Sequence, residues 1–394
     1  MSTPQGTDGS HPGGNSSSAE KAAAVSRTAT ATLPPNRRLL EVVDLQTQFR
    51  TARGMVRAVD GVSFSLDRGR TLGIVGESGS GKTVLARSIM GLLPKRNVVR
   101  HGKVLYEGLD MLSASADQVR DLWGAEMAMV FQDPMTSLNP VLRIGNQITE
   151  GMRFHLKMDR KTAGATALAL LKEVGIPEPA RRLRQYPHEL SGGMRQRIMI
   201  AVALACGPKL LFADEPTTAL DVTVQAQILN LLQREQRDRD MAMILVTHDL
   251  GVVAGRADEI AVMYAGQLVE KAPTATLFAN VRMPYTEALL KSIPALDAPS
   301  HSRLQAIPGR PPDLVNPPPG CRFAPRCTYA RDRCHEEPPP LLEGGQDHFY
   351  RCWYPVGLSA PVKLRSGPDR ASAVDGPTTP EPPAPPSEPT KGVE

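Results

Sequence analysis

The chain has 394 residues, enough for two or three domains, and 41% of them are hydrophobic, which is enough for a globular core. Its net charge of +5 is mild and its basic residues form no long stripe, so no nucleic-acid partner is expected. No apolar run reaches the ~18–20 residues that span a bilayer, and no secretion signal is visible. We therefore expect a cytosolic protein whose five cysteines form no disulfides.

The first predicted secondary-structure elements are two strands, which come after an N-terminal tail. Residues 1–37 are rich in Ser, Gly, Ala, Thr and Pro, and we expect them to be disordered. The segments 39–49 and 55–66 then have the pattern of two strands with a turn near residues 53–54. Phe49 ends the first strand and is a candidate to stack on adenine; a half-buried strand aromatic is an equally good interpretation.

A glycine-rich loop follows a short apolar run, residues 71–75, which is typical of a buried strand. Residues 76–83 read Gly-Glu-Ser-Gly-Ser-Gly-Lys-Thr, the phosphate-binding pattern G-x-x-x-x-G-K-[ST]. Backbone N–H groups of this loop, and of a helix predicted at 84–92, would point at phosphate oxygens. We expect Lys82 to reach the β- and γ-phosphates and Thr83 to hold Mg²⁺. The residues expected to bind ATP in this loop are Gly76, Ser78, Gly79, Ser80, Gly81, Lys82 and Thr83.

Three further apolar runs, at 127–131, 210–213 and 241–246, predict buried strands. Polar residues follow each of them: Gln132, then Asp214 with Glu215, then His248. Residues 134–189 are helix-rich, and 165–174 is the clearest helix. Strands that alternate with helices predict an α/β fold with a mostly parallel sheet and a site at the carboxyl ends of its strands.

Residues 190–196 read Leu-Ser-Gly-Gly-Met-Arg-Gln and precede a helix predicted near Met194. N–H groups at such a helix start make an anion site. The order of phosphate loop, Gln132, this motif, Asp-Glu, Ala-Leu-Asp (219–221) and His248 resembles that of ABC-type ATPase domains. The resemblance implies an ATPase domain at 38–272, with an N-terminal antiparallel β subdomain and a helical subdomain at about 134–195.

The resemblance also implies roles for single residues. Asp214 would hold Mg²⁺ together with Thr83 and Gln132, Glu215 would polarise the attacking water, and His248 would contact the γ-phosphate. Taken alone, two carboxylates at a strand end are a solvated pair, and a histidine there is more often structural. The residues implied to face ATP bound by a second ATPase domain are Ser191, Gly192, Gly193 and Asp221.

Finer stretches resemble the ATP-binding subunits of oligopeptide, dipeptide and nickel importers. They are residues 73–82, 131–140, 186–193 and 283–290, Pro308-Gly309 and residues 318–321. The resemblance implies a peripheral subunit on the cytoplasmic face of the membrane that powers peptide import. Its implied partners are two permeases, a second and different ATPase chain, and an extracytoplasmic binding protein. The loop 133–139 would dock on a permease; an ordinary active-site loop is the alternative.

Two alternatives to peptide import stay open at this point. Nickel, haem or another small solute is the alternative cargo within the importer class. A soluble ABC ATPase that acts on nucleic acid or ribosomes is the alternative from another class, which the single ATPase domain disfavours.

A small Cys- and Pro-rich extension is predicted at 273–356, followed by a disordered Pro-rich tail at 357–394. Cys321, Cys327, Cys334 and Cys352 follow the spacing C-x5-C-x6-C-x17-C, which lacks the pairs of a zinc ribbon. Four thiolates suit a [4Fe–4S] cluster, which the resemblance also implies, or a structural zinc; four free thiols are the alternative, and His335 is an alternative ligand. A metal cross-link would explain how this segment folds. Four nearby arginines are expected to favour thiolates: Arg322, Arg326, Arg331 and Arg333.

Overall fold

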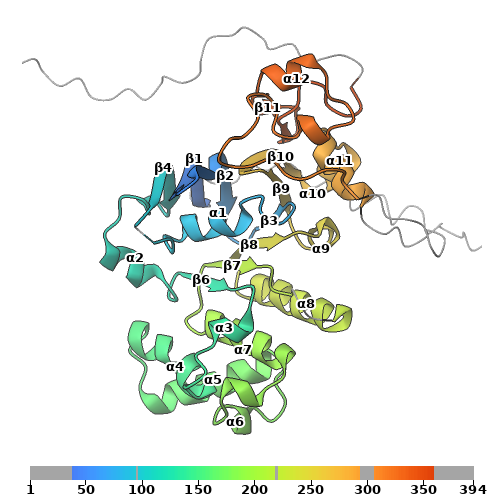
Figure 1. The fold of residues 1–394 in the computed structure, drawn as a ribbon. Helices are drawn as coiled ribbons and strands as arrows, with labels where there is room; N and C mark the ends of the chain where they lie inside the picture. The colour runs from blue at the N-terminus through green and yellow to red at the C-terminus, as the bar shows by residue number, and fades with distance from the viewer. Residues whose placement is uncertain (1–37, 95, 218–220, 293–305, 359–394) are drawn as a thin grey trace, which may run out of the picture.

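The computed structural model describes residues 38–94, 96–217, 221–292 and 306–358 (Figure 1). The predicted tail at 1–37, and all but the first two residues of the one at 357–394, lie outside these ranges. In Figure 1 a group of green helices lies at one end of the molecule and the orange C-terminal segment at the other, with the sheets between them. Within these ranges, no helix combines the length and the apolar character that crossing a membrane requires.

The small sheet is antiparallel, as predicted, with strand order β2-β1-β4-β5. Its strands are β1 (Arg38–Thr51), β2 (Gly54–Asp67), β4 (Val98–Tyr106) and β5 (Leu109–Asp110). The predicted turn is the tight connection between β1 and β2. Because β2 lies at an edge of this sheet, part of its backbone needs hydrogen-bond partners from elsewhere in the chain.

The large sheet has the order β11-β12-β10-β9-β3-β8-β7-β6. Its strands are β3 (Thr71–Val75), β6 (Met127–Val130), β7 (Leu210–Asp214), β8 (Ala242–Thr247), β9 (Glu259–Tyr264), β10 (Gln267–Pro273), β11 (Leu342–Glu343) and β12 (Phe349–Tyr350). The five strands from β9 to β6 are parallel, and every residue of β3, β7 and β8 is buried. Burial on both faces explains why these strands are continuous apolar runs rather than alternating ones.

Helix α1 (Lys82–Ile89) lies between the two sheets and starts directly at the end of the glycine-rich loop (Figure 1). Leu85, Ala86 and Ile89 share one apolar core with residues of both sheets. Further helices outside the green group are α2 (Ala116–Leu122), α8 (Val222–Asp238), α9 (Leu250–Ala254) and α10 (Thr274–Ala279). The carboxyl end of β3 and the amino end of α1 are therefore fixed against the core.

The helical segment lies between β6 and β7, from Pro134 to Leu204, and so ends later than the predicted bound of about 195. Its helices are α3 (Pro134–Ser137), α4 (Ile144–His155), α5 (Arg160–Glu173), α6 (Pro179–Arg182), the 3₁₀ turn η1 (Pro187–Glu189) and α7 (Gly192–Leu204). Side chains of Asp133, Asp159 and Ser191 accept backbone N–H groups at the starts of α3, α5 and α7. These caps explain where the three helices begin.

The C-terminal extension continues the large sheet instead of forming a separate sheet. Strand β12 pairs antiparallel with β10, and β11 pairs with β12. The other elements of the extension are α11 (Pro284–Lys291), η2 (Ala324–Arg326) and α12 (Asp332–Glu336). Phe323 packs against Tyr264 of β9 and Tyr285 of α11, with both ring centroid distances at 5.3 Å. This aromatic anchor shows that a metal cross-link is not required to explain the position of the extension.

Candidate functional site

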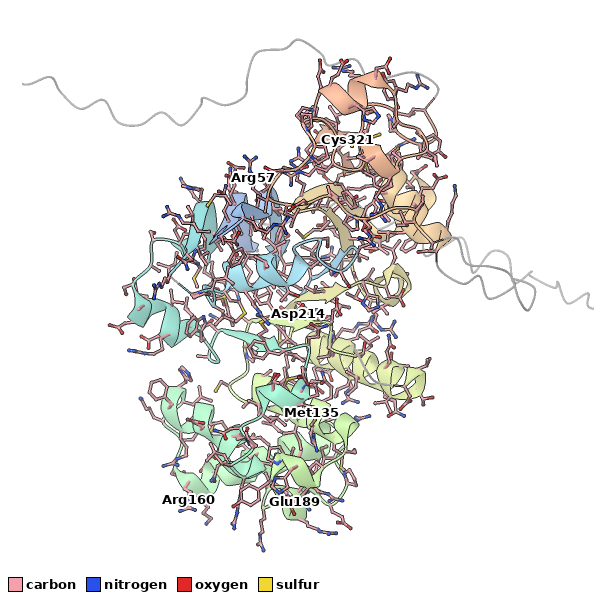
Figure 2. The ribbon with its side chains drawn as sticks, in the orientation of Figure 1. Arg57, Met135, Arg160, Glu189, Asp214 and Cys321 are labelled. Carbon is pink, nitrogen blue, oxygen red and sulfur yellow. The ribbon has the colours of Figure 1, made fainter. Side chains whose placement is uncertain are left out.

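A cavity of about 430 Å³ lies at the carboxyl ends of the central strands. Its lining residues come from the small sheet, the glycine-rich loop, two strand ends and the extension, and they are Phe49, Val56, Ala58, Ser78, Gly79, Gly81, Lys82, Thr83, Val84, Gln132, Glu215 and Leu314. In Figure 2, Asp214 at the end of β7 lies between Cys321 at one end of the molecule and Arg160 and Glu189 at the other. The structure thus gathers most of the predicted ATP residues around one cavity.

The glycine-rich loop needs its last glycine. Gly81 has φ = 101°, and a Cβ there would come within 2.2 Å of the carbonyl oxygen of Ala58. Only glycine therefore allows the loop to pass so close to β2. The free N–H groups at the start of α1 then face the cavity, which suits an anionic ligand.

Lys82 is a buried cation in a position that suits the binding of an anionic group. Its side chain is 4% exposed, and its Nζ donates to the carbonyl oxygens of Gly76 at 2.7 Å and Glu77 at 3.1 Å. Burial lowers the pKa of Lys82, while the carboxylates of Glu215, Asp214 and Glu77 act in the opposite direction. A phosphate group would replace the carbonyl contacts with stronger, charge-assisted ones.

Asp214 and Thr83 meet at the end of β7. The Thr83 Oγ1 donates to Asp214 Oδ1 at 2.9 Å, while Asp214 Oδ2 is buried without a hydrogen-bond partner. Burial raises the pKa of Asp214. A buried carboxylate oxygen without a partner is costly, and Mg²⁺ or a water bound to it would satisfy this atom. The residues present therefore fit the predicted magnesium site.

Glu215 lies at the centre of the polar side chains. Gln132 Nε2 donates to Glu215 Oε2 at 3.0 Å, and His248 Nδ1 lies 3.5 Å from the same oxygen. Lys82 Nζ lies 3.9 Å from the other oxygen. Glu215 has φ = 45°, a left-handed conformation that few non-glycine residues adopt and that is often found at functional positions. The structure thus brings together all three predicted catalytic side chains.

The Leu-Ser-Gly-Gly motif lies outside this cavity. Ser191 caps α7 by accepting the N–H of Met194 at 3.4 Å, and Asp221 caps α8 by accepting that of Val224 at 2.9 Å. Gly192 and Gly193 form the first turn of α7. Ala219 and Leu220 lie outside the described residues. A role of these motifs toward the ATP of a second domain remains a prediction.

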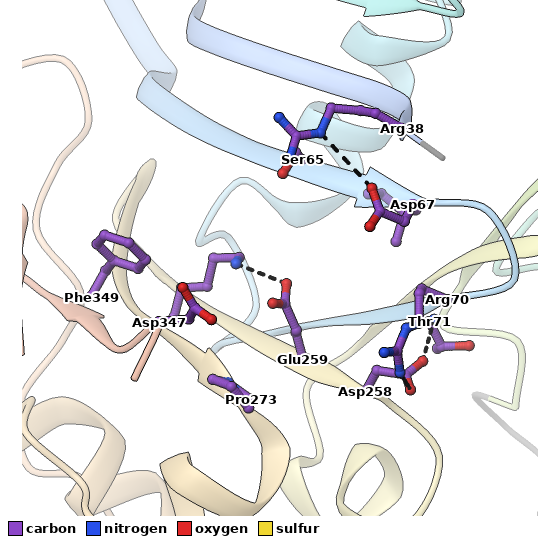
Figure 3. A pocket seen from close by; sticks show the side chains of 12 residues that line it. Arg38, Ser65, Asp67, Arg70, Thr71, Asp258, Glu259, Pro273, Asp347 and Phe349 are labelled. Atoms are coloured by element: carbon purple, nitrogen blue, oxygen red, sulfur yellow. Dashed lines mark hydrogen bonds and ion pairs between the residues drawn. The ribbon is translucent and has the colours of Figure 1, made fainter. Parts of the chain in front are cut away.

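A larger cavity, of about 540 Å³, lies at the opposite ends of the strands (Figure 3). Its charged groups already neutralise one another: Arg38 lies 3.9 Å from Asp67, Arg70 2.6 Å from Asp258, and Lys271 2.8 Å from Glu259. None of its lining residues belongs to the glycine-rich loop. We therefore assign the chemistry to the smaller cavity, which the glycine-rich loop and the buried Lys82 line and where Thr83 contacts Asp214.

All four cysteines of the extension line one small apolar pocket of about 10 Å³, together with aromatic side chains such as Phe323 and Trp353. Even so, the described part of the chain contains no group of three or more His, Cys, Asp or Glu side chains arranged to hold a metal ion. The prediction of a cluster or zinc is therefore not supported by the geometry. The space suits about one water molecule, so a four-iron cluster would require the thiols to move apart.

The expected effect of the arginines on these thiols is wrong. Burial raises the pKa of Cys321, that of Cys327 to about 11 and that of Cys352 to about 12. The arginines are engaged elsewhere: Arg322 with Asp60, Arg326 with Glu77, Arg331 over the ring of Tyr354 and Arg333 over that of Trp353. A raised pKa favours the protonated thiol, so Cys321, Cys327 and Cys352 are not activated in this state.

Sequence reasoning missed several residues of the ATP cavity. Val56 faces Phe49 across the β1–β2 pair. A prediction of the exact register between these two strands would have identified it. Leu314 comes from the extension, more than two hundred residues after the glycine-rich loop, and no pattern in the sequence indicates its position.

Comparisons with known proteins agree with this site. The model of the family described as "ABC transporter" matches residues 59–218, and that of the "Oligopeptide/dipeptide transporter, C-terminal region" matches residues 269–334. The chain is 51% identical to the oligopeptide transport ATP-binding protein OppD of Bacillus subtilis, over 80% of this chain and 88% of that protein. It is 49% identical to the dipeptide transport ATP-binding protein DppD of Escherichia coli, over 81% and 97% of the two chains.

Solved structures show the same fold. A dimeric ATP-binding cassette in a post-hydrolysis state with ADP and Pi is similar to this chain, with a TM-score of 0.55 and 25% identity over 60% of this chain and 99% of the other. The matched families, the identity of about one half and the shared fold confirm the resemblance drawn from the sequence motifs. The chain belongs to the ABC transporter family, among its oligopeptide/dipeptide-type ATP-binding proteins.

Proposed function

We propose that this chain hydrolyses ATP to power the import of di- and oligopeptides through two permease subunits. The observation that carries the proposal is the convergence of Lys82, Thr83 and Glu215 on one cavity, with Asp214 hydrogen-bonded to Thr83. The chain is also half identical to peptide-transport ATP-binding proteins. The complex would sit at the cytoplasmic face of the membrane, with a second, different ATPase chain and an extracytoplasmic binding protein.

Each of these side chains has a separate role in hydrolysis. Lys82 and the start of α1 bind the phosphates, and bound Mg²⁺, held by Thr83, Asp214 and Gln132, would neutralise charge on the phosphate oxygens. Glu215 accepts a hydrogen bond from the attacking water and draws its proton away as the water reaches the γ-phosphorus. His248, whose Nδ1 lies 3.5 Å from Glu215, would donate to the γ-phosphate. Positioning and charge account for the chemistry, with no covalent intermediate.

The second ATPase would complete the site. Ser191 and the N–H groups of Gly192 and Gly193 would contact the γ-phosphate bound to the partner chain, and Asp221 would lie at the same interface. Val222, the first residue of α8 after Asp221, is 82% exposed. So large an exposed apolar side chain beside a predicted interface residue supports burial by a partner.

Permease docking is proposed for the loop after Gln132. Met135 of α3, labelled in Figure 2, is 61% exposed, and Val141 is 76% exposed. A helix of a permease would cover these apolar side chains. Gln132 directly precedes this loop and donates a hydrogen bond to Glu215. Movement of the loop would therefore shift Gln132 relative to Glu215 in the hydrolytic site.

Uptake by the reconstituted transporter tests this proposal. Proteoliposomes that contain the permeases, both ATPases and the binding protein should accumulate labelled peptide only with ATP. Glu215→Gln should bind ATP yet lower hydrolysis and uptake at least about hundredfold, as loss of a general base does, whereas Glu336→Gln, an exposed carboxylate of α12, should change neither. Parallel assays with nickel and haem test the other cargoes; uptake of either, without peptide uptake, would refute the peptide assignment.

The four-cysteine pocket is a second part of the proposal. We propose that Cys321, Cys327, Cys334 and Cys352 bind a [4Fe–4S] cluster, or zinc, after a rearrangement of the pocket. Their common position around one pocket supports this, although their present geometry does not hold a metal ion. Iron, sulfide and zinc analysis of anaerobically purified protein, with Cys334→Ser beside wild type, decides it. Protein with neither metal would refute the proposal without affecting the ATPase assignment.

A further inference from the structure

A short segment of the extension, residues 313–315, lies on the free edge of β2. The N–H of Arg57 in β2 donates to the carbonyl oxygen of Leu314 at 3.0 Å. Arg53, in the β1–β2 turn, pairs with Asp313 at 2.7 Å, and Asp313 also accepts the N–H of Val315 at 3.0 Å. The extension therefore supplies a backbone partner that the edge strand lacks within its own sheet. Figure 2 shows Arg57 on the side of the small sheet that faces the extension.

This pairing places the side chain of Leu314 in the wall of the ATP cavity. The other apolar side chains of that wall include Phe49 and Val56, which face each other across the β1–β2 pair. The polar lining residues Lys82, Thr83, Gln132 and Glu215 belong to the phosphate end. A nucleotide with its phosphates at Lys82 would therefore have its base against Phe49, Val56 and Leu314.

The extension also holds the phosphate end of the site. Glu77, the second residue of the glycine-rich loop, accepts two hydrogen bonds from Arg326, at 2.7 and 2.9 Å. The backbone N–H of Glu77 donates to the hydroxyl of Tyr285 in α11 at 2.9 Å. Because Glu77 is held through both its side chain and its backbone, the extension is fixed in place next to the nucleotide.

From these contacts we infer that the C-terminal extension forms part of the nucleotide-binding site, with Leu314 as a base-contacting residue. This inference rests on the proposed ATPase function and deepens it. The contact is apolar, since Phe49, Val56 and Leu314 all present hydrocarbon side chains to the cavity. Leu314 would thus add affinity for a purine ring through buried area, without a choice between adenine and guanine.

Equilibrium binding to the full-length chain tests the inference with two probes, ATP and inorganic triphosphate, both with Mg²⁺. Leu314→Ala should raise the Kd for ATP about three- to tenfold, from the apolar area lost, and leave the Kd for triphosphate unchanged. Leu314→Met should behave as wild type. Leu358→Ala, which removes an exposed leucine just after the extension, is the matched control and should change neither value.

The outcomes separate the inference from the function on which it rests. If Leu314→Ala weakens both probes equally, Leu314 only supports the fold, and unchanged binding of both also overturns the inference. Failure of the wild type to bind ATP would overturn the proposed function itself. Labelling of the wild type with 8-azido-ATP needs no variant: we expect label in the peptide that contains Leu314. Label confined to the β1–β2 region would contradict the inference.

Discussion

The ion pair between Arg326 and Glu77 gives the most demanding prediction. Arg326 has a side chain that is 4% exposed, and that of Glu77 is 26% exposed. Arg326→Met keeps the apolar stem but leaves the Glu77 carboxylate without its bidentate partner. Breaking a fully buried pair costs ~3–5 kcal/mol and an exposed pair ~0–1 kcal/mol. Because Glu77 is partly exposed, we expect Arg326→Met to lower the free energy of unfolding by an amount between these two values, about 2–3 kcal/mol.

Calorimetry of the nucleotide-free protein measures the loss. At about 2–4 °C per kcal/mol for domains of this size, the unfolding temperature should fall by about 4–12 °C. Because Glu77 lies in the glycine-rich loop, kcat/KM for ATP should fall as well. Arg120→Met is the matched control: its pair with Asp117 is exposed, so the expected shift is below about 4 °C.

A double-mutant cycle isolates the pair. Glu77→Gln combined with Arg326→Met should cost less than the sum of the two single changes, since each already removes the interaction. Strict additivity, or a shift for Arg326→Met no larger than that of the control, would refute the claim that this pair fastens the extension to the loop.

Three further predictions concern single groups. Lys82→Ala should raise the Kd for ATP at least about tenfold, from the loss of charge-assisted hydrogen bonds, and unchanged affinity in a titration would remove Lys82 from the site. Because burial raises the pKa of Asp214, its ionisation costs stability above the ordinary carboxyl pKa. Metal-free Asp214→Asn should therefore gain stability relative to wild type as the pH rises from about 4 to about 7.5 in denaturant titrations; a stability difference independent of pH would contradict this. Burial raises the pKa of Cys327 to about 11 and that of Cys352 to about 12, so iodoacetamide at pH 8 should label them slowly in the folded, metal-free protein and rapidly in denaturant. Equal rates in the two states would contradict the buried pocket.

The sequence was sufficient for the parts of this site that depend on local chemistry. The glycine-rich loop, Gln132, Asp214, Glu215 and His248 each follow a buried strand, and parallel strands bring such residues to one edge of a sheet. Apolar runs identified the strands because both faces of the large sheet are covered. A motif next to a buried parallel strand can therefore be placed at the carboxyl edge of the sheet from the sequence alone.

Contacts made by the extension were not predictable in the same way. Leu314, Tyr285 and Arg326 reach the nucleotide site through a pairing of β12 with β10 and an aromatic cluster, which follow from tertiary packing and not from local periodicity. The arginines beside the cysteines illustrate the same limit. Proximity in sequence suggested that they stabilise thiolates, but Arg322 and Arg326 point to carboxylates of the ATPase core instead.

Extraction of the tagged chain from its native membrane in mild detergent, with mass spectrometry of everything that co-purifies, tests the transport assignment most directly. We expect two permeases, a second ATPase and an extracytoplasmic binding protein, and the peptides bound to that last protein should identify the cargo. Recovery of the chain without permeases, together with ribosomes or nucleic acid, would contradict the importer assignment while leaving the ATPase chemistry intact.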